Sequence, residues 1–157
     1  MRAVELVPMT EEEFTAYREH VIVAYAEAKV HAGNWPAQDA RRLSEEAHEQ
    51  LLPAGLVTSV NHIYTARDGG RVVGTLWFAE RDGESGRLAY LYNIEVHREQ
   101  RGKGYGKAMM AALEDEVAKL GLDTIQLHVF GDNTTARSLY AGAGYAETNV
   151  VMSKRLR

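Results

Sequence analysis

Seven consecutive residues combine glycines with cationic side chains in a pattern suited to binding an anion. Segment 101–107 reads Arg-Gly-Lys-Gly-Tyr-Gly-Lys and carries three positive charges, whereas the whole chain has a formal net charge of −4. A strand-like run at 91–96 precedes it, and a helical pattern follows directly. The first N–H groups of a helix have no partner within the helix, and glycines let a phosphate approach them closely. The sequence therefore predicts a pyrophosphate-binding loop.

The spacing of the glycines distinguishes between kinds of phosphate-binding loop. The P-loop of NTPases has four residues between its glycines and a Ser or Thr after its lysine. Here three residues separate Gly102 from Gly106, and no hydroxyl residue follows Lys107, which argues against a nucleotide switch or kinase. The dinucleotide pattern G-x-G-x-x-G is also missed. What remains is Arg-x-x-Gly-x-Gly, from Arg101 through Gly104 to Gly106, which a simple glycine-rich turn before a helix could also produce.

A second segment, 133–145, reads Asn-Thr-Thr-Ala-Arg-Ser-Leu-Tyr-Ala-Gly-Ala-Gly-Tyr. Asn133 is a favourable helix N-cap, Ala136 and Tyr140 share one helical face, and Gly144 suits the left-handed position after a helix end. Together the two segments resemble the two signatures of the GCN5-related N-acetyltransferase (GNAT) family, in the order and at roughly the separation that the family uses. The resemblance covers about residues 88–154.

The resemblance implies a fold and a cofactor. It implies one N-acetyltransferase domain over residues 1–157, of class α/β (mixed α+β), with a central, mostly antiparallel twisted sheet and helices on both faces. It also implies acetyl-CoA or coenzyme A as co-substrate. The implied cofactor contacts are Ile94, Val96, Arg101, Gly102, Lys103, Gly104, Tyr105, Gly106, Lys107, Asn133 and Ala136.

Two residues are candidates for proton transfer. The resemblance places Tyr140 beside the cofactor sulfur as general acid, and a phenol with a pKa near 10 is protonated at neutral pH. On helical periodicity alone, Tyr140 could equally be a core aromatic residue. An acceptor amine with a pKa near 10.4 is neutral about once in 2,500 at pH 7, so the site needs a base or a water chain. Glu95 is the first candidate, with Tyr92 and His97 in reserve, although Glu95 could also be a solvent-facing carboxylate.

The expected reaction is acetyl transfer to a primary amine by direct attack in a ternary complex. Acceptors in view are an aminoglycoside-like antibiotic, a polyamine, an amino-acid derivative or a peptide. Tyr92, His31 and Trp35 lie where the family usually builds its acceptor pocket, so they are the expected substrate contacts. The alternative is a coenzyme A-binding regulatory or interaction module that keeps the fold without turnover. Dimers are common in the family, which leaves a homodimer open.

Composition sets limits on other classes of function. The 157 residues contain no cysteine, which excludes disulfides, thiolate metal sites and a cysteine nucleophile, and suits a cytoplasmic location. The six histidines show no metal-ligand spacing, so we expect no metal site. A pI near 5.9 argues against general nucleic-acid binding, and no apolar run approaches the roughly 20 residues that span a membrane. The N-terminus has no apolar core typical of a secretory signal.

The elements that must position these residues can be read from periodicity and turn signals. A capping-box pattern from Thr10 to Glu13 predicts a helix that ends at 33–36, and a second helix is expected at 37–51. Further helices follow the glycine loop, up to Gly121, and Asn133. Expected strands lie at 3–7, 62–67, 71–79, 87–97, 123–130 and 146–154.

Overall fold

One five-stranded sheet organises the protein. The structure, a computed structural model, describes residues 3–157, and residues 1–2 lie outside it. The strands in sheet order are β1 (Glu5–Pro8), β2 (Asn61–Asp68), β3 (Arg71–Gly83), β4 (Gly86–Val96) and β5 (Ile125–Leu127). The first four pair antiparallel, and β5 pairs parallel to β4. This confirms the mixed, mostly antiparallel sheet.

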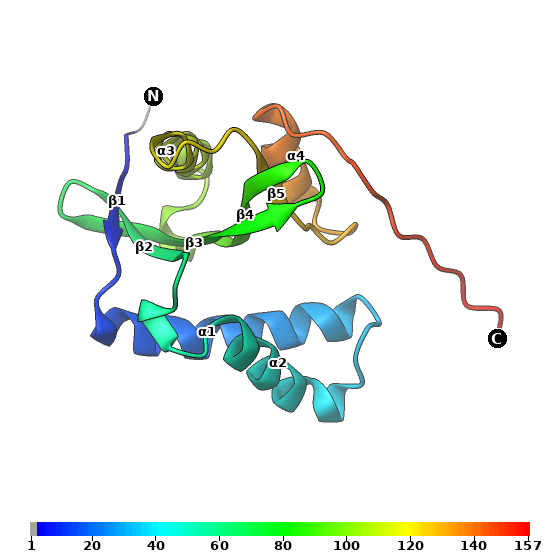
Figure 1. The fold of residues 1–157 in the computed structure, drawn as a ribbon. Coiled ribbons are helices and arrows are strands. Elements are labelled where there is room, and N and C mark those ends of the chain that lie inside the picture. The colour runs from blue at the N-terminus through cyan, green and yellow to red at the C-terminus, as the bar shows by residue number, and fades with distance from the viewer. Residues whose placement is uncertain (1–2) are drawn as a thin grey trace.

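Helices cover both faces of the sheet (Figure 1). On one face lie α1 (Glu11–His31) and α2 (Ala37–Leu51), and on the other α3 (Tyr105–Lys119) and α4 (Thr134–Gly142). Short 3-10 helices span Gly55–Val57 and Arg98–Gln100. Within residues 3–157, no helix combines the length and the apolar character that crossing a bilayer requires.

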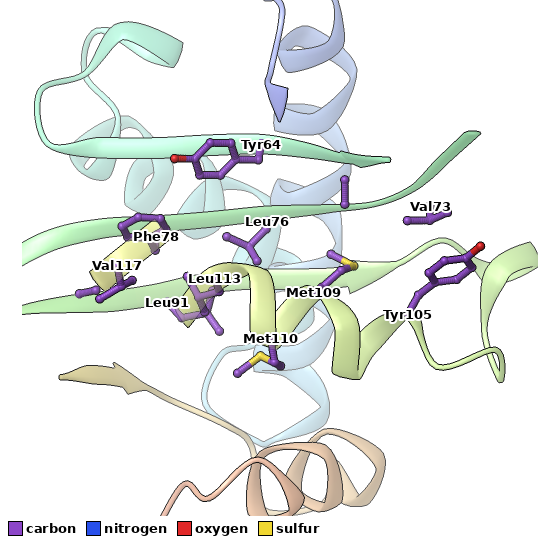
Figure 2. Close-up of a cluster of buried hydrophobic side chains, with 12 residues drawn as sticks. Tyr64, Val73, Leu76, Phe78, Leu91, Tyr105, Met109, Met110, Leu113 and Val117 are labelled. Carbon is purple, nitrogen blue, oxygen red and sulfur yellow. The ribbon is translucent and has the colours of Figure 1, made fainter. Parts of the chain in front are cut away.

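Each helical layer has its own core against the sheet. The core under α3 (Figure 2) is built from these buried side chains: Tyr64, Val73, Leu76, Phe78, Leu91, Tyr105, Met109, Met110, Leu113 and Val117. The core under α1 joins Phe14, Tyr17, Val21, Leu52, Ile63 and Trp77. The start of α1 is fixed by the expected capping box, in which Glu13 N–H donates to Thr10 Oγ1 at 3.1 Å and Thr10 N–H to Glu13 Oε1 at 2.9 Å.

A β-bulge in β4 changes which side chains face which core. Leu91 lies opposite Phe78 and Asn93 opposite Trp77, so Tyr92 is the extra residue. Strict alternation would place Tyr92 and Ile94 on one face. Instead, Ile94 packs against the α3 core and Tyr92 against the α1 core. The parity expected for Tyr92 from the sequence is therefore wrong, because one bulged residue shifts the alternation.

The same region of β4 separates from β5. Their ladder contains only Ala89–Leu91 on β4 and Ile125–Leu127 on β5. Residues 92–96 therefore have no β5 partner in the described part of the chain, and β5 is much shorter than the expected strand 123–130. The expected last strand at 146–154 is also wrong: residues 146–157 have no regular secondary structure, since no neighbouring strand pairs with them.

Candidate active site

The glycine loop presents the start of α3 without a side-chain cap. Gly102 and Gly104 have φ values of 76° and 89°, in the left-handed region that L-residues adopt only at a cost. Gly104 is the N-cap of α3 and offers no side chain to the helix N–H groups. Those groups therefore stay available to a ligand, and the helix dipole favours an anion there. This geometry fits the diphosphate of coenzyme A.

The side chains of the loop divide between the ligand face and the fold. Tyr105 is only 1% exposed, and its hydroxyl donates to Asp68 Oδ2 at 2.5 Å, which ties the start of α3 to the β2–β3 hairpin. Only the backbone of Tyr105 is thus placed for a ligand. Arg101 Nε donates to the carbonyl oxygen of Val96 at 3.0 Å, and Lys103 Nζ to Gln100 Oε1 at 3.3 Å. The side chains of both cations therefore start from positions next to the end of β4.

Gly106 has a packing role that the sequence did not reveal. A Cβ atom added there would lie 3.4 Å from Leu139 Cδ2 and 3.9 Å from Val96 Cγ2. The missing side chain lets α4 approach both α3 and the end of β4. Gly106 therefore helps to place α4, and with it Tyr140, beside the loop.

Asn133 caps α4 as expected. Its Oδ1 accepts a hydrogen bond from Ala136 N–H at 3.1 Å. The polar groups of these two expected cofactor contacts are thus paired with each other, so Asn133 acts here first as a structural cap. Lys107 is exposed on the first turn of α3.

Tyr140 lies in an apolar setting on the α3 side of the sheet. It packs against the α3 core, and its ring centroid is 6.0 Å from that of Tyr145. Burial raises the pKa of Tyr140 above its usual value. Burial, with smaller effects from Glu114 and Tyr140, raises the pKa of Tyr145 to about 12. Both phenols line a cavity of about 540 Å³ formed by β5, α4 and the residues that follow α4.

Glu95 lies on the opposite, α1 side of the sheet and is paired with a histidine. His20 Nε2 is 2.8 Å from Glu95 Oε1 and 3.1 Å from Oε2, and the side chains are 54% and 29% exposed. Nearby, the Tyr17 hydroxyl donates to Asn93 Oδ1 at 2.9 Å. Burial, with the negative charge of Glu95, raises the pKa of Tyr17. The Glu95–His20 pair therefore joins a buried polar network to the surface.

A second cavity, of about 550 Å³, contains the Glu95–His20 pair. It runs between α1, the sheet and the loop, and includes His97 and Arg101. Sequence reasoning missed His20, whose only signal was its spacing of three residues from Tyr17 on one helical face. The structure thus brings Glu95 to His20 and His97, while Tyr140 lines the other cavity.

The three expected acceptor contacts make other interactions. Tyr92 stacks on Trp77, with ring centroids 4.6 Å apart. Trp35 packs edge-on against Tyr25 at 5.4 Å, with the Lys29 ammonium 5.2 Å from its ring centroid. His31 Nε2 lies 2.5 Å from Asp132 Oδ2, which links the end of α1 to the loop before α4. Of the described residues that line the two cavities, none is one of these three.

Comparison with known proteins decides the family. A model of the acetyltransferase (GNAT) family matches residues 26–145. The chain belongs to this family. The GNAT chain is 40% identical to the uncharacterized N-acetyltransferase YycN of Bacillus subtilis, over 96% of this chain and 97% of YycN. The crystal structure of YycN superposes with a TM-score of 0.94 over 99% of both chains, at 39% identity.

Two further relatives extend the comparison. The uncharacterized N-acetyltransferase YdgE of B. subtilis is 34% identical over 98% of this chain and 99% of its own length. The mycothiol acetyltransferase of Thermobispora bispora is 32% identical over 78% of this chain, which matches only 40% of that longer protein. The chain is therefore a GNAT-family acetyltransferase, and the family uses acetyl-CoA. Among residues 3–157, no group of three or more His, Asp or Glu side chains is placed to hold a metal ion.

Proposed function

We propose that this enzyme transfers the acetyl group of acetyl-CoA to a primary amine of a small molecule or peptide, by direct attack in a ternary complex. The observation that carries the proposal is the separation of β4 from β5 beside the uncapped start of α3. A ligand held at the loop can extend along residues 92–96 and reach both faces of the sheet. We further propose that residues 1–157 form a single acetyltransferase domain. The cytoplasmic location stays a prediction.

The loop and β4 supply the binding groups for the co-substrate. The N–H groups after Gly104 suit the diphosphate, and the β4 backbone near Ile94 and Val96 suits the amide groups of the pantetheine arm. Acetyl-CoA supplies an activated acetyl thioester. A backbone N–H at the opening that donates to its carbonyl oxygen would contribute roughly 3 kcal/mol to the transition state.

Glu95 and His20 fit the removal of a proton from the acceptor. Keeping a lysine-like amine neutral at pH 7 costs roughly 4.6 kcal/mol, which a nearby base lowers. Glu95 can accept the proton directly or through water, and His20 contacts both carboxylate oxygens. Because His20 is more exposed than Glu95, it offers the proton a path to bulk solvent. His97, in the same cavity, stays a reserve candidate.

Tyr140 fits the donation of a proton to the leaving thiolate. Its raised pKa keeps the phenol protonated throughout the neutral range. Its apolar surroundings leave few competing partners for that proton. The roles of Tyr140 and Glu95, and acceptor contacts by Tyr92, His31 and Trp35, are parts of this proposal that variants must test.

Release of free thiol from acetyl-CoA tests the function. The purified chain is mixed with acetyl-CoA and each member of an amine panel: aminoglycosides, polyamines, amino-acid derivatives and a lysine peptide. The similarity to a mycothiol acetyltransferase is a reason to begin with small molecules. We expect at least one amine to raise thiol release well above the rate without amine, with a product heavier by one acetyl group. Binding of coenzyme A without amine-dependent release across the panel would instead support the non-catalytic module.

A further inference from the structure

The C-terminal tail, residues 146–157, leaves the body of the protein with its apolar side chains in water. Figure 1 shows it as an extended segment that runs from α4 away from the sheet and the helices. Four large hydrophobic side chains in it are exposed: Val150 (67%), Val151 (96%), Met152 (88%) and Leu156 (83%). Three of them are consecutive and β-prone. A cluster of this kind usually marks a surface that is covered by something else.

The edge of the sheet closest to the tail is open. β5 pairs with β4 on one side, and no strand among residues 3–157 pairs with its other side. Along β5 and α4 runs the cavity of about 540 Å³, which also includes the first residues of the tail. The hydroxyl of Tyr145 is buried there and has no hydrogen-bond partner within the described residues. An unpaired edge beside an apolar cavity is a template for an added strand.

We propose that the protein is a dimer in which the tail of each copy lies along β5 of the other copy, adds a sixth strand to that sheet and closes its cavity. The tail and the open edge complement each other but do not meet within one chain, and a two-fold exchange satisfies both at once. Charge agrees. The tail holds Glu147 against Lys154, Arg155 and Arg157, a net +2, and the chain total of −4 leaves −6 on the rest.

The relative YycN shows that the extended tail is not peculiar to this chain. The tail is 12 of 157 residues, about 8% of the chain. A TM-score of 0.94 over 99% of both chains could not be reached if these residues took another course. An exposed apolar tail held in the same direction in both proteins indicates a fixed position against a partner.

The exchange bears on the site as well as on assembly. The cavity that the partner's tail would close contains Tyr140 and Tyr145. The partner would shield the Tyr140 phenol from water and supply backbone groups near the unpaired Tyr145 hydroxyl. The inference goes beyond the proposed reaction, and assembly is measured without substrate, so either can fail alone.

Light scattering on the full chain gives the first test. We expect a mass twice the chain's 17.5 kDa, and a chain truncated after Tyr145 to have the mass of a monomer. Because truncation could impair folding, Val151→Asp is measured beside it and should also shift the chain toward monomer. A monomeric full chain overturns the proposal, and so does a folded truncated chain that remains dimeric.

Cysteine cross-linking decides which copy the tail occupies, since the chain has no cysteine of its own. Gln126 is an exposed residue of β5. Two differently tagged chains, one with Gln126→Cys and one with a single cysteine at 149, 150, 151 or 152, are co-expressed and oxidised. We expect a disulfide-linked heterodimer for at least one tail position and none with a control cysteine at exposed Gln50 on α2. If chains carrying both cysteines cross-link only within themselves, the tail folds back on its own sheet and the proposal is wrong.

Discussion

The two faces of the sheet offer contrasting environments for proton transfer. On the α1 face, Glu95 is paired with His20 and open to water. On the α3 face, Tyr140 is surrounded by apolar side chains that raise its pKa. A proton acceptor gains from a charged partner and a path to solvent, and a proton donor gains from staying neutral. The sheet keeps the two groups apart, and the opening between β4 and β5 gives one ligand access to both.

Removal of the Tyr140 hydroxyl should break the apolar side of this comparison and have the largest effect. Tyr140→Phe is expected to lower kcat by roughly 10²-fold, because the leaving thiolate loses its proton donor. Steady-state thiol release across the pH range measures it. Tyr145→Phe is the matched control, since that ring lies 6.0 Å away in the same cavity, and its kcat should change little. Unchanged kcat in Tyr140→Phe at all pH values would remove Tyr140 from the mechanism.

Neutralising Glu95 should break the polar side. Glu95→Gln is expected to lower kcat/KM at pH 7 by roughly 30-fold, since water can partly replace the base. The loss should shrink as the pH rises and the amine deprotonates by itself, while affinity for acetyl-CoA stays unchanged by calorimetry. Glu80→Gln is the control, because Glu80 forms a similar pair with His62 at 2.9 Å outside both cavities. Loss of cofactor affinity alone would argue against Glu95 as the base.

A conformational change in the loop should affect both faces equally, because both depend on the same bound ligand. Gly104→Ala forces an L-residue to a φ of 89°, at a cost of about 1 kcal/mol, and should weaken acetyl-CoA binding about tenfold. Gly121→Ala imposes the same strain at a φ of 78° beyond the other end of α3. It should lower Tm without changing affinity. Equal affinity losses in the two variants would mean that the loop has no special role.

The smallest effect should come from His20, which acts on the reaction through Glu95. His20→Gln is expected to lower kcat/KM about fivefold, near the lower end for a residue that passes on a proton. The pH profile of kcat/KM should lose its His20-dependent limb, which a purely structural role would not change. His62→Gln, the matched variant of the second histidine–glutamate pair, should leave the profile as it is. Identical profiles for His20→Gln and the unmodified enzyme would contradict the relay.

Local signals were enough to predict much of the fold. The Thr10–Glu13 capping box, the glycine loop and the Asn133 cap depend on residues close together in sequence, and the structure confirms each. The faces of β4 could not be predicted, because the bulge at Tyr92 depends on the register with β3. His20 was missed because its partner Glu95 lies 75 residues away. The tail has the composition of a strand, but a strand forms only where a partner is available.

Titration of the purified full chain with acetyl-CoA in a calorimeter tests the central claim most directly, namely that the backbone around Gly104 binds the diphosphate of coenzyme A. The account predicts saturable binding with one site per chain, weakened about tenfold in Gly104→Ala and unchanged in Gly121→Ala. Absence of heat and of any thermal shift with well-folded protein at millimolar acetyl-CoA would contradict it.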